Sequence, residues 1–306
     1  MIKKTLLAAA FAAATSNPAQ AQSDNAFGIP TEQVTNPAAS VVAAPGSRGQ
    51  GWLGQGRSEV LARHGIVATS DPLAAQAGLE ILQQGGNAID AAVAASAVLD
   101  VTSQNDTGLA GDLFALVWSA ADQKLYALNS AGFAPAGWTP EFFKEELGLD
   151  RIPGRGVNAA TVPGAISGYD ALLERFGTMG FEETFERAAR LAEEGWGQSE
   201  RRHSDLTSQQ EKLLQDPDSA AVFLNEGEVP PLYSIIRNPG LADALRLIQE
   251  QGREAFYSGA IADALVAKVQ SEGGVMTHED LAAFESEWVE PISTTYHGYD
   301  IFQLPP

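Results

Sequence analysis

The 306-residue sequence contains no cysteine. It can therefore form neither a disulfide nor a thiolate nucleophile, so its stability has to come from its own hydrophobic core. A chain of this length can build such a core, in one large domain or two smaller ones. Its hydrophobic fraction of 44% and charged fraction of 19% are those of an ordinary globular protein.

Basic residues are scarce, because 19 Lys and Arg stand against 39 Asp and Glu and give a formal charge of −20. Nucleic acids and anionic membrane surfaces are bound through basic faces, so neither is expected as a partner. Long apolar runs are also missing, and no stretch reaches the roughly 20 residues that cross a bilayer. An acidic surface favours solubility and identifies no substrate.

The first 21 residues have the three parts of a secretory signal peptide. Lys3 and Lys4 form a basic start, TLLAAAFAAAT is a short apolar run, and residues 19–21 make an A-x-A cleavage site. We therefore predict a signal peptide over 1–21 and a periplasmic or secreted location. Residues 22–56 are rich in proline, glycine and serine and are predicted to form a low-complexity linker.

The stretch ILQQGGNAIDAAVAAS (81–96) is predicted to contain the end of one helix and the start of another. Glycine destabilises a helix interior by about 1 kcal/mol relative to alanine, so the pair at 85–86 indicates a helix end. Asn87 is a favourable N-cap for a second helix, which is expected to run to about residue 100.

The first of these helices is predicted to follow a buried strand at residues 65–70, where β-branched residues are frequent. Ser70 or Asp71 would cap the helix, and Pro72 would occupy its first turn.

The rest of the chain mixes strand and helix patterns. Residues 113–119 and 124–130 flank a short turn and predict an antiparallel hairpin. Thr277 and Asp280 form a capping box for a short helix at 279–284. Further helices are expected at 166–176, 182–194, 199–215, 238–252 and 258–274, with a loop or edge strand at 157–165 and a strand-like tail at 295–304. The pattern predicts an α+β fold.

Several catalytic signatures are absent or misplaced. The sequence has no G-x-S-x-G, and HEDLA at 278–282 lacks the second histidine of a zinc helix. GRGVNA at 154–159 follows a proline rather than a strand, which argues against a dinucleotide site. Adjacent acids such as those at 193–194 do not converge on one point and are interpreted as a solvated face.

What remains resembles the gamma-glutamyltranspeptidase family over residues 57–306. The resemblance is carried, in the order typical of the family, by GGNAIDAAVA (85–94), TGLAGDLFALVW (107–118), ATVPGAISGYDALLERFGTMGFEETFERAARLAEEG (160–195), REAFYSGAIADALVAKVQSEGGVMTHEDLAAF (253–284) and WVEPISTTYHGY (288–299).

The resemblance implies an exported, autoprocessing precursor with the αββα fold of N-terminal-nucleophile hydrolases. Such a precursor cuts itself into a large and a small subunit, and the cut exposes a threonine at the start of the small subunit. The hydroxyl of this threonine attacks a γ-glutamyl or related amide, its own α-amine acts as the base, and an acyl-enzyme passes to water or to an acceptor amine. This chemistry implies no cofactor or metal.

Residues 57–306 resemble the large-subunit part alone, so the fold is expected to be incomplete. TTYH at 294–297 is rejected as the processing junction, because it lies in a strand pattern and its cut would release about a dozen residues, too few for a subunit. We therefore expect the nucleophile beyond residue 306, no catalytic residue within this sequence, and no activity from this fragment alone. The missing small subunit is its expected partner.

The resemblance places substrate-binding residues at Asn129, Ser130, Ala131 and Phe133. In the family an arginine of this segment grips the substrate carboxylate, and it would align with Ala131 or, in a related subgroup, with Phe133. Neither position is basic here, which predicts an altered specificity or an arginine supplied by the missing half. Asp112 also replaces a typical glycine, and the loop before it is expected to support the hairpin rather than to touch substrate.

Three functions remain open. The first is a glutathione hydrolase or gamma-glutamyl transfer enzyme acting on a small amide. The second is a cephalosporin- or glutaryl-type acylase on the same scaffold, which the aromatic residue at 133 would suit. The third is a non-catalytic exported relative that uses the fold for binding or assembly.

Overall fold

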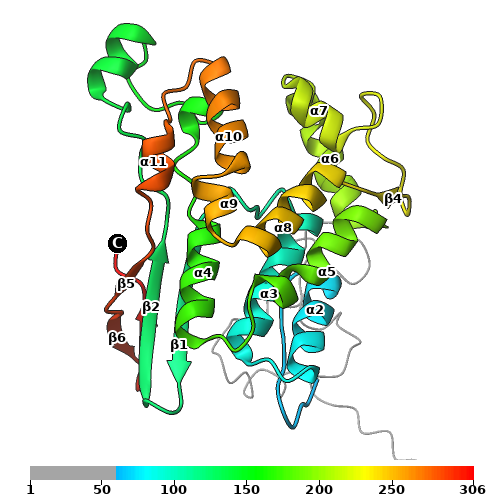
Figure 1. Ribbon diagram of the computed structural model, residues 1–306, viewed down its shortest axis with the longest axis vertical. Coiled ribbons are helices and arrows are strands. Elements are labelled where there is room, and N and C mark those ends of the chain that lie inside the picture. Colours follow the sequence, from blue (N-terminus) through cyan, green and yellow to red (C-terminus); the bar gives the residue numbers. More distant parts are fainter. Residues whose placement is uncertain (1–59) are drawn as a thin grey trace, which may run out of the picture. The chain divides into compact units, whose positions relative to one another are not determined.

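The computed structural model describes residues 60–306 (Figure 1). The folded unit begins with two helices that are separated by a pair of glycines. The predicted signal peptide (1–21) and linker (22–56) lie outside the described residues. Helix α2 spans Pro72–Gln83, and helix α3 spans Ala88–Thr102. These bounds confirm the two predicted helices.

Side-chain caps start both helices as predicted. Asp71 Oδ1 accepts a hydrogen bond from the backbone N–H of Leu73 at 2.7 Å, which makes Asp71 rather than Ser70 the cap of α2. Asn87 Oδ1 accepts from the N–H of Ile89 at 2.8 Å at the start of α3. Gly85, between the helices, has φ of 97°, a left-handed conformation that glycine adopts without strain.

The predicted strand at residues 65–70 does not form. A strand needs a neighbouring segment with free backbone hydrogen-bonding groups, and this segment instead packs on α2. A Cβ atom at Gly78 would lie 2.9 Å from Val67 Cγ1, so the valine side chain fits directly against the helix backbone. The apolar pattern therefore reflects packing on a helix.

The predicted hairpin is the centre of a three-stranded antiparallel sheet. Strand β1 spans Leu113–Ser119, β2 spans Lys124–Ser130, and the two are paired along their whole length. Strand β5 (Glu287–Val289) pairs with the other edge of β2, where Trp288 lies opposite Leu128.

Helix α4 (Ala165–Phe176) packs against both strands of the hairpin and also contacts α3 (Figure 1). The main helical neighbour of the hairpin is therefore α4. Close approach explains this arrangement: a Cβ atom at Gly168 would lie 2.9 Å from Leu113 Cδ2 and 3.0 Å from Ser130 Cβ.

The core continues from α3 into α5 (Phe181–Glu194) and from α5 into α8 (Pro239–Gln251). Phe185, Ala188 and Ala192 of α5 are fully buried, at the spacing of one face of a helix. No helix within residues 60–306 is long and apolar enough to cross a membrane.

The remaining helices and strands differ in their bounds from several of the predicted ones. They are β3 (Trp196–Gly197), α6 (Glu200–Leu213), α7 (Pro217–Phe223), β4 (Ile235–Ile236), α9 (Glu254–Tyr257), α10 (Ala260–Ser271), α11 (His278–Ala282), β6 (Ile292–Tyr296), β7 (Tyr299–Gln303), a π turn at Phe142–Glu146 and a 3-10 turn at Val157–Ala159. The polar region 199–215 ends before α7, which begins at a new cap, Asp216. The capping box at α11 is confirmed, and the fold is mixed α+β.

Candidate functional site

The loop between α3 and β1, residues 103–112, lies against the start of α4. The carbonyl of Gly111 accepts hydrogen bonds from the backbone N–H groups of Gly164 and Ala165, at 2.9 and 2.8 Å. N–H groups at a helix start have no partner inside the helix. The loop therefore caps α4 and is itself fixed by this contact.

The same loop holds the segment that follows β2. Asp112 Oδ1 accepts a hydrogen bond from the N–H of Gly132 at 2.7 Å, and the N–H of Val162 donates to the carbonyl of Phe133 at 2.9 Å. A Cβ atom at Gly132 would lie only 1.8 Å from the carbonyl oxygen of Val162. Glycine is thus required at this position, and the segment is fixed between two loops.

Ser130 is the most deeply buried of the four predicted substrate-binding residues, with 1% of its surface exposed. Its Oγ donates to the carbonyl of Gly164 at 2.7 Å and lies 2.7 Å from Ser286 Oγ, which is 2.8 Å from Ser167 Oγ. These hydroxyls join β2, α4 and the approach to β5. The side chain of Ser130 therefore belongs to the packing beneath the site.

The other three predicted residues lie nearer the surface. Asn129 is half-buried, and its Oδ1 accepts from the N–H of Ala131 at 3.0 Å, which shapes the turn out of β2. Ala131 is also half-buried. Phe133 is 42% exposed, and its ring centroid lies 5.4 Å from that of Phe284. Ala131 and Phe133 thus offer an apolar surface where a carboxylate-binding arginine was considered.

A cavity of about 550 Å³ opens beside Asp112. It is formed by α3, the 103–112 loop, β1 and α4, with Asp100, Thr107, Gly111, Asp112, Phe114 and Tyr169 among its lining residues. This volume is in the range of small-molecule sites, which span roughly 300–1,000 Å³. The cavity and the fixed segment at 129–133 together form the candidate substrate site.

Asp100 is the main titratable group of this cavity, and it is 2% exposed. Burial raises the pKa of Asp100 to about 7, although hydrogen bonds with Tyr169 and Thr107 oppose the shift. Burial also raises the pKa of the Tyr169 hydroxyl, which donates to Asp100 Oδ2 at 3.0 Å. The carboxyl group therefore exchanges its proton near neutral pH.

The sequence interpretation did not single out Asp100. The available signal was its spacing, because residue 100 lies three positions after Ala97 and seven after Val93 on the apolar face of a helix. An acid on such a face is either paired or protonated when the helix is buried.

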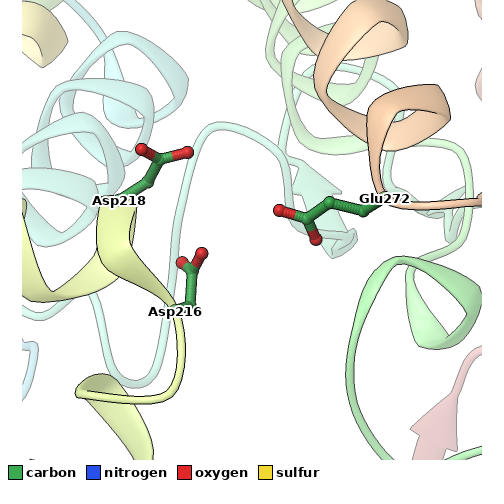
Figure 2. A group of neighbouring side chains, drawn as sticks. All are labelled: Asp216, Asp218 and Glu272. Atoms are coloured by element: carbon green, nitrogen blue, oxygen red, sulfur yellow. The ribbon is translucent and has the colours of Figure 1, made fainter.

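A second group of acids lies away from this cavity. Asp216, Asp218 and Glu272 direct carboxylate oxygens toward one another, all within 4.8 Å (Figure 2). Lys268 Nζ lies 3.5 Å from Asp216 Oδ1 and also contacts Asp218 and Glu272. Hydrogen bonds to Asp218 and Glu272 raise the pKa of Lys268, so the cluster already contains its own cation. It links α7 to α10, and we assign it no metal.

The chain is a mixed α+β protein. Helices cover one face of its small antiparallel sheet, and a cavity bounded by loops lies beside that sheet. Residues 74–306 match the gamma-glutamyltranspeptidase family, and the chain belongs to that family. The resemblance seen in the sequence is confirmed.

Relatives agree in sequence and structure. The glutathione hydrolase-like YwrD proenzyme of Bacillus subtilis (strain 168) is 37% identical over 242 residues, which cover 79% of this chain and 46% of that protein. The gamma-glutamyltranspeptidase of Helicobacter pylori matches with a TM-score of 0.77 and 30% identity, over 81% of this chain and 72% of the other. The cephalosporin acylase of Bacillus halodurans matches with a TM-score of 0.75 and 37% identity, over 82% and 49%. The chain spans about half the length of the curated relatives it matches.

Proposed function

We propose that residues 57–306 are the large-subunit part of a gamma-glutamyltranspeptidase-like precursor with an incomplete αββα fold. The observation that carries the proposal is the open face of β1. Phe114, Leu116 and Trp118 are 60%, 42% and 58% exposed there, while the alternate residues of the strand face α4. A sheet with apolar side chains on both faces needs a packed layer of protein on each face. A second sheet, supplied by a small subunit, would provide the missing cover.

The C-terminal hairpin supports the same proposal. Every residue of β6 and β7 is exposed, including Tyr296, Ile301 and Phe302. A two-stranded hairpin is marginally stable in water by itself. Packing against further protein would stabilise this one and bury its apolar side chains.

The proposed reaction is cleavage of a small amide through an acyl-enzyme. The nucleophile is a threonine beyond residue 306, freed by self-cleavage, and its α-amine accepts the proton from its hydroxyl. Attack on the amide carbonyl expels an amine, and water or an acceptor amine then takes the acyl group. This chain contributes no catalytic residue and is inactive without the small subunit.

The role that we propose for this chain is recognition of the acyl group. Asn129 and Ser130 would set the path of the segment, whereas Ala131 and Phe133 would contact substrate. A charge-assisted hydrogen bond to a substrate carboxylate contributes roughly 1.5–3 kcal/mol, and neither contact residue can supply one. A γ-glutamyl substrate would therefore need an arginine from the missing half.

A second candidate function is a cephalosporin- or glutaryl-type acylase. The exposed ring of Phe133, which packs on the buried ring of Phe284, favours it, because an aromatic surface suits an acyl group that is less polar than γ-glutamyl. The third alternative, a non-catalytic exported relative, predicts that no threonine follows at a processing junction. The proposed signal peptide places any of the three in the periplasm or outside the cell.

Sequencing the gene beyond the codon for Pro306 and expressing the complete reading frame tests the proposal. We expect two chains after purification, the smaller with an N-terminal threonine, and hydrolysis of a chromogenic amide. Comparing γ-glutamyl-p-nitroanilide with glutaryl-p-nitroanilide separates the first two functions. A frame without a junction threonine would exclude both and leave the non-catalytic alternative.

A further inference from the structure

Gln198, directly after β3, is a buried amide without a partner. Its backbone is fixed, because its N–H donates to the carbonyl of Ser234 at 2.8 Å and its carbonyl accepts from the N–H of Tyr233 at 2.9 Å. The residue is 1% exposed, and within residues 60–306 neither Oε1 nor Nε2 has a hydrogen-bond partner. Leaving such a group unsatisfied is costly, so it calls for an explanation.

Arg202, on the first turn of α6, is the second unusual group. It is 8% exposed, and its guanidinium donates to Asn105 Oδ1 at 2.5 Å and lies 5.6 Å from the ring of Phe223. No ion pair within 4.0 Å is formed by Arg202 among the described residues, although the charges of Asp205 and Asp106 act on it from farther away. Burial lowers the pKa of Arg202, which nevertheless stays charged at neutral pH because arginine titrates far above it. Several of its donors are therefore available to an anion.

Gln198 and Arg202 line one cavity of about 360 Å³. The lining also includes the apolar side chains of Trp196, Val222, Phe223 and Ile235, together with polar residues (Gln104, Asn225, Ser234, Arg237 and Asn238). The cavity lies between β3–β4 and the α6–α7 pair, and a lining residue, Gln104, is also part of the cavity beside Asp112. A charged donor, a free amide and an apolar wall in one small volume are the usual components of a ligand site.

The edge of this cavity is strained. Tyr233, next to the lining residue Ser234, has φ of 63°, a left-handed conformation that is unfavourable for an aromatic residue. Its hydroxyl donates to Glu200 Oε1 at 2.9 Å, which holds the turn in place. Local strain of this kind is concentrated at ligand clamps and other functional sites.

We propose that this cavity binds a small carboxylate with a neighbouring amide and an apolar side chain, the chemistry of an N-acyl amino acid. Arg202 pairs with the carboxylate, Gln198 pairs with the amide through its free carbonyl or NH₂ group, and Trp196 and Phe223 contact the apolar side chain. This site adjoins the cavity beside Asp112 at Gln104, and binding to it does not depend on amide cleavage.

Calorimetric titration of the 306-residue chain with N-acetyl-L-leucine tests the proposal. We expect saturable binding of one molecule per chain. N-acetyl-L-leucinamide, which lacks only the carboxylate charge, is expected to bind at least about tenfold more weakly. Absence of binding by N-acetyl-L-leucine, or equal binding of the two compounds, would overturn the proposal.

Two variants connect binding to these residues. Gln198→Leu removes the unpaired amide while keeping the volume, so it is expected to raise the thermal midpoint and to weaken binding about tenfold or more. Arg202→Lys keeps the charge but loses the planar fork, and a similar loss of affinity is expected. Arg190→Gln, on α5, is the matched control and is expected to bind like the parent chain. A lower thermal midpoint for Gln198→Leu, or affinity unaffected by both variants, would contradict the proposal.

Discussion

The carboxylate of Asp112 and the N–H of Gly132 form a 2.7 Å hydrogen bond between the two ends of one hairpin. Leu113 and Ser130 are the terminal pair of β1 and β2, so the bond joins the residue before one strand to a residue shortly after the other. The position of the proposed acyl-group contacts is therefore set by a side chain in the neighbouring loop.

Replacing Asp112 with alanine is expected to loosen this segment. The N–H of Gly132 would lose its partner, and because this hydrogen bond is exposed to solvent, the free energy of unfolding is expected to fall by only about 1 kcal/mol. Amide hydrogen exchange at Gly132 and urea unfolding measure the two effects. Asp243→Ala, an exposed helical site, serves as the control. Unchanged exchange at Gly132 in the Asp112 variant would contradict the assignment.

Gly132→Ala tests the close approach to Val162 directly. A Cβ atom 1.8 Å from a carbonyl oxygen forces the two loops apart, which is expected to lower the free energy of unfolding by roughly 1–3 kcal/mol or more. Gly154→Ala is the matched control, because no atom lies within 4 Å of the added methyl group. Equal free energies of unfolding for the two variants in urea would contradict this prediction, because they would show that the two loops can move apart without loss of stability.

Asp100→Asn is expected to change how stability depends on pH. The pKa of Asp100 is about 7 in the folded protein and near 3.8 when unfolded, so the folded chain binds more protons between these values. The free energy of unfolding then falls as pH rises through this window, by up to about 1.4 kcal/mol per pH unit. Asparagine cannot titrate and still accepts from Tyr169.

Thermal melts from pH 4 to pH 8 measure this effect. The Asn variant is expected to match the parent protein most closely near pH 4 and to exceed its thermal midpoint increasingly toward pH 8. Asp243→Asn is expected to follow the parent protein throughout. Parallel curves for the Asp100 variant and the parent would mean that Asp100 is already ionised in the folded state at pH 4.

The sequence predicted those features of the fold that depend on neighbouring residues. The caps at Asn87 and Thr277 were identified, and that of α2 was narrowed to Ser70 or Asp71, because the hydrogen bonds that define caps join residues two or three positions apart. The hairpin was predicted for a similar reason, since a short turn joins two strands of alternating pattern.

Features that depend on distant partners were not predictable. Asp90 was known only as part of a family motif, yet its buried carboxylate accepts from both the backbone N–H and the hydroxyl of Thr178, 88 residues away. Ser130 was predicted to bind substrate, and its side chain is buried because Gly164 and Ser286 approach from other parts of the chain. One sequence carries no direct signal for such pairings.

The exposed sheet face gives a further prediction. The double variant Leu116→Ser, Trp118→Ser is expected to keep the stability of the isolated chain and to reduce its self-association, because it removes an exposed apolar patch. Light scattering and urea unfolding measure these properties. Val117→Ser, on the buried face of the same strand, is expected to cost roughly 2 kcal/mol or more. In the complete precursor, normal subunit assembly by the double variant would argue against docking on this face.

The α2–α3 pair has a consequence for how the molecule reaches its native state. Only four residues, 84–87, separate these helices, yet their mutual packing is the most extensive between any two elements of the described chain. Contacts that are close in sequence form quickly, because little loop entropy is lost in making them. This pair is therefore expected to be an early folding nucleus, on which α5 and then α8 assemble while the sheet, with its later third strand, is completed last.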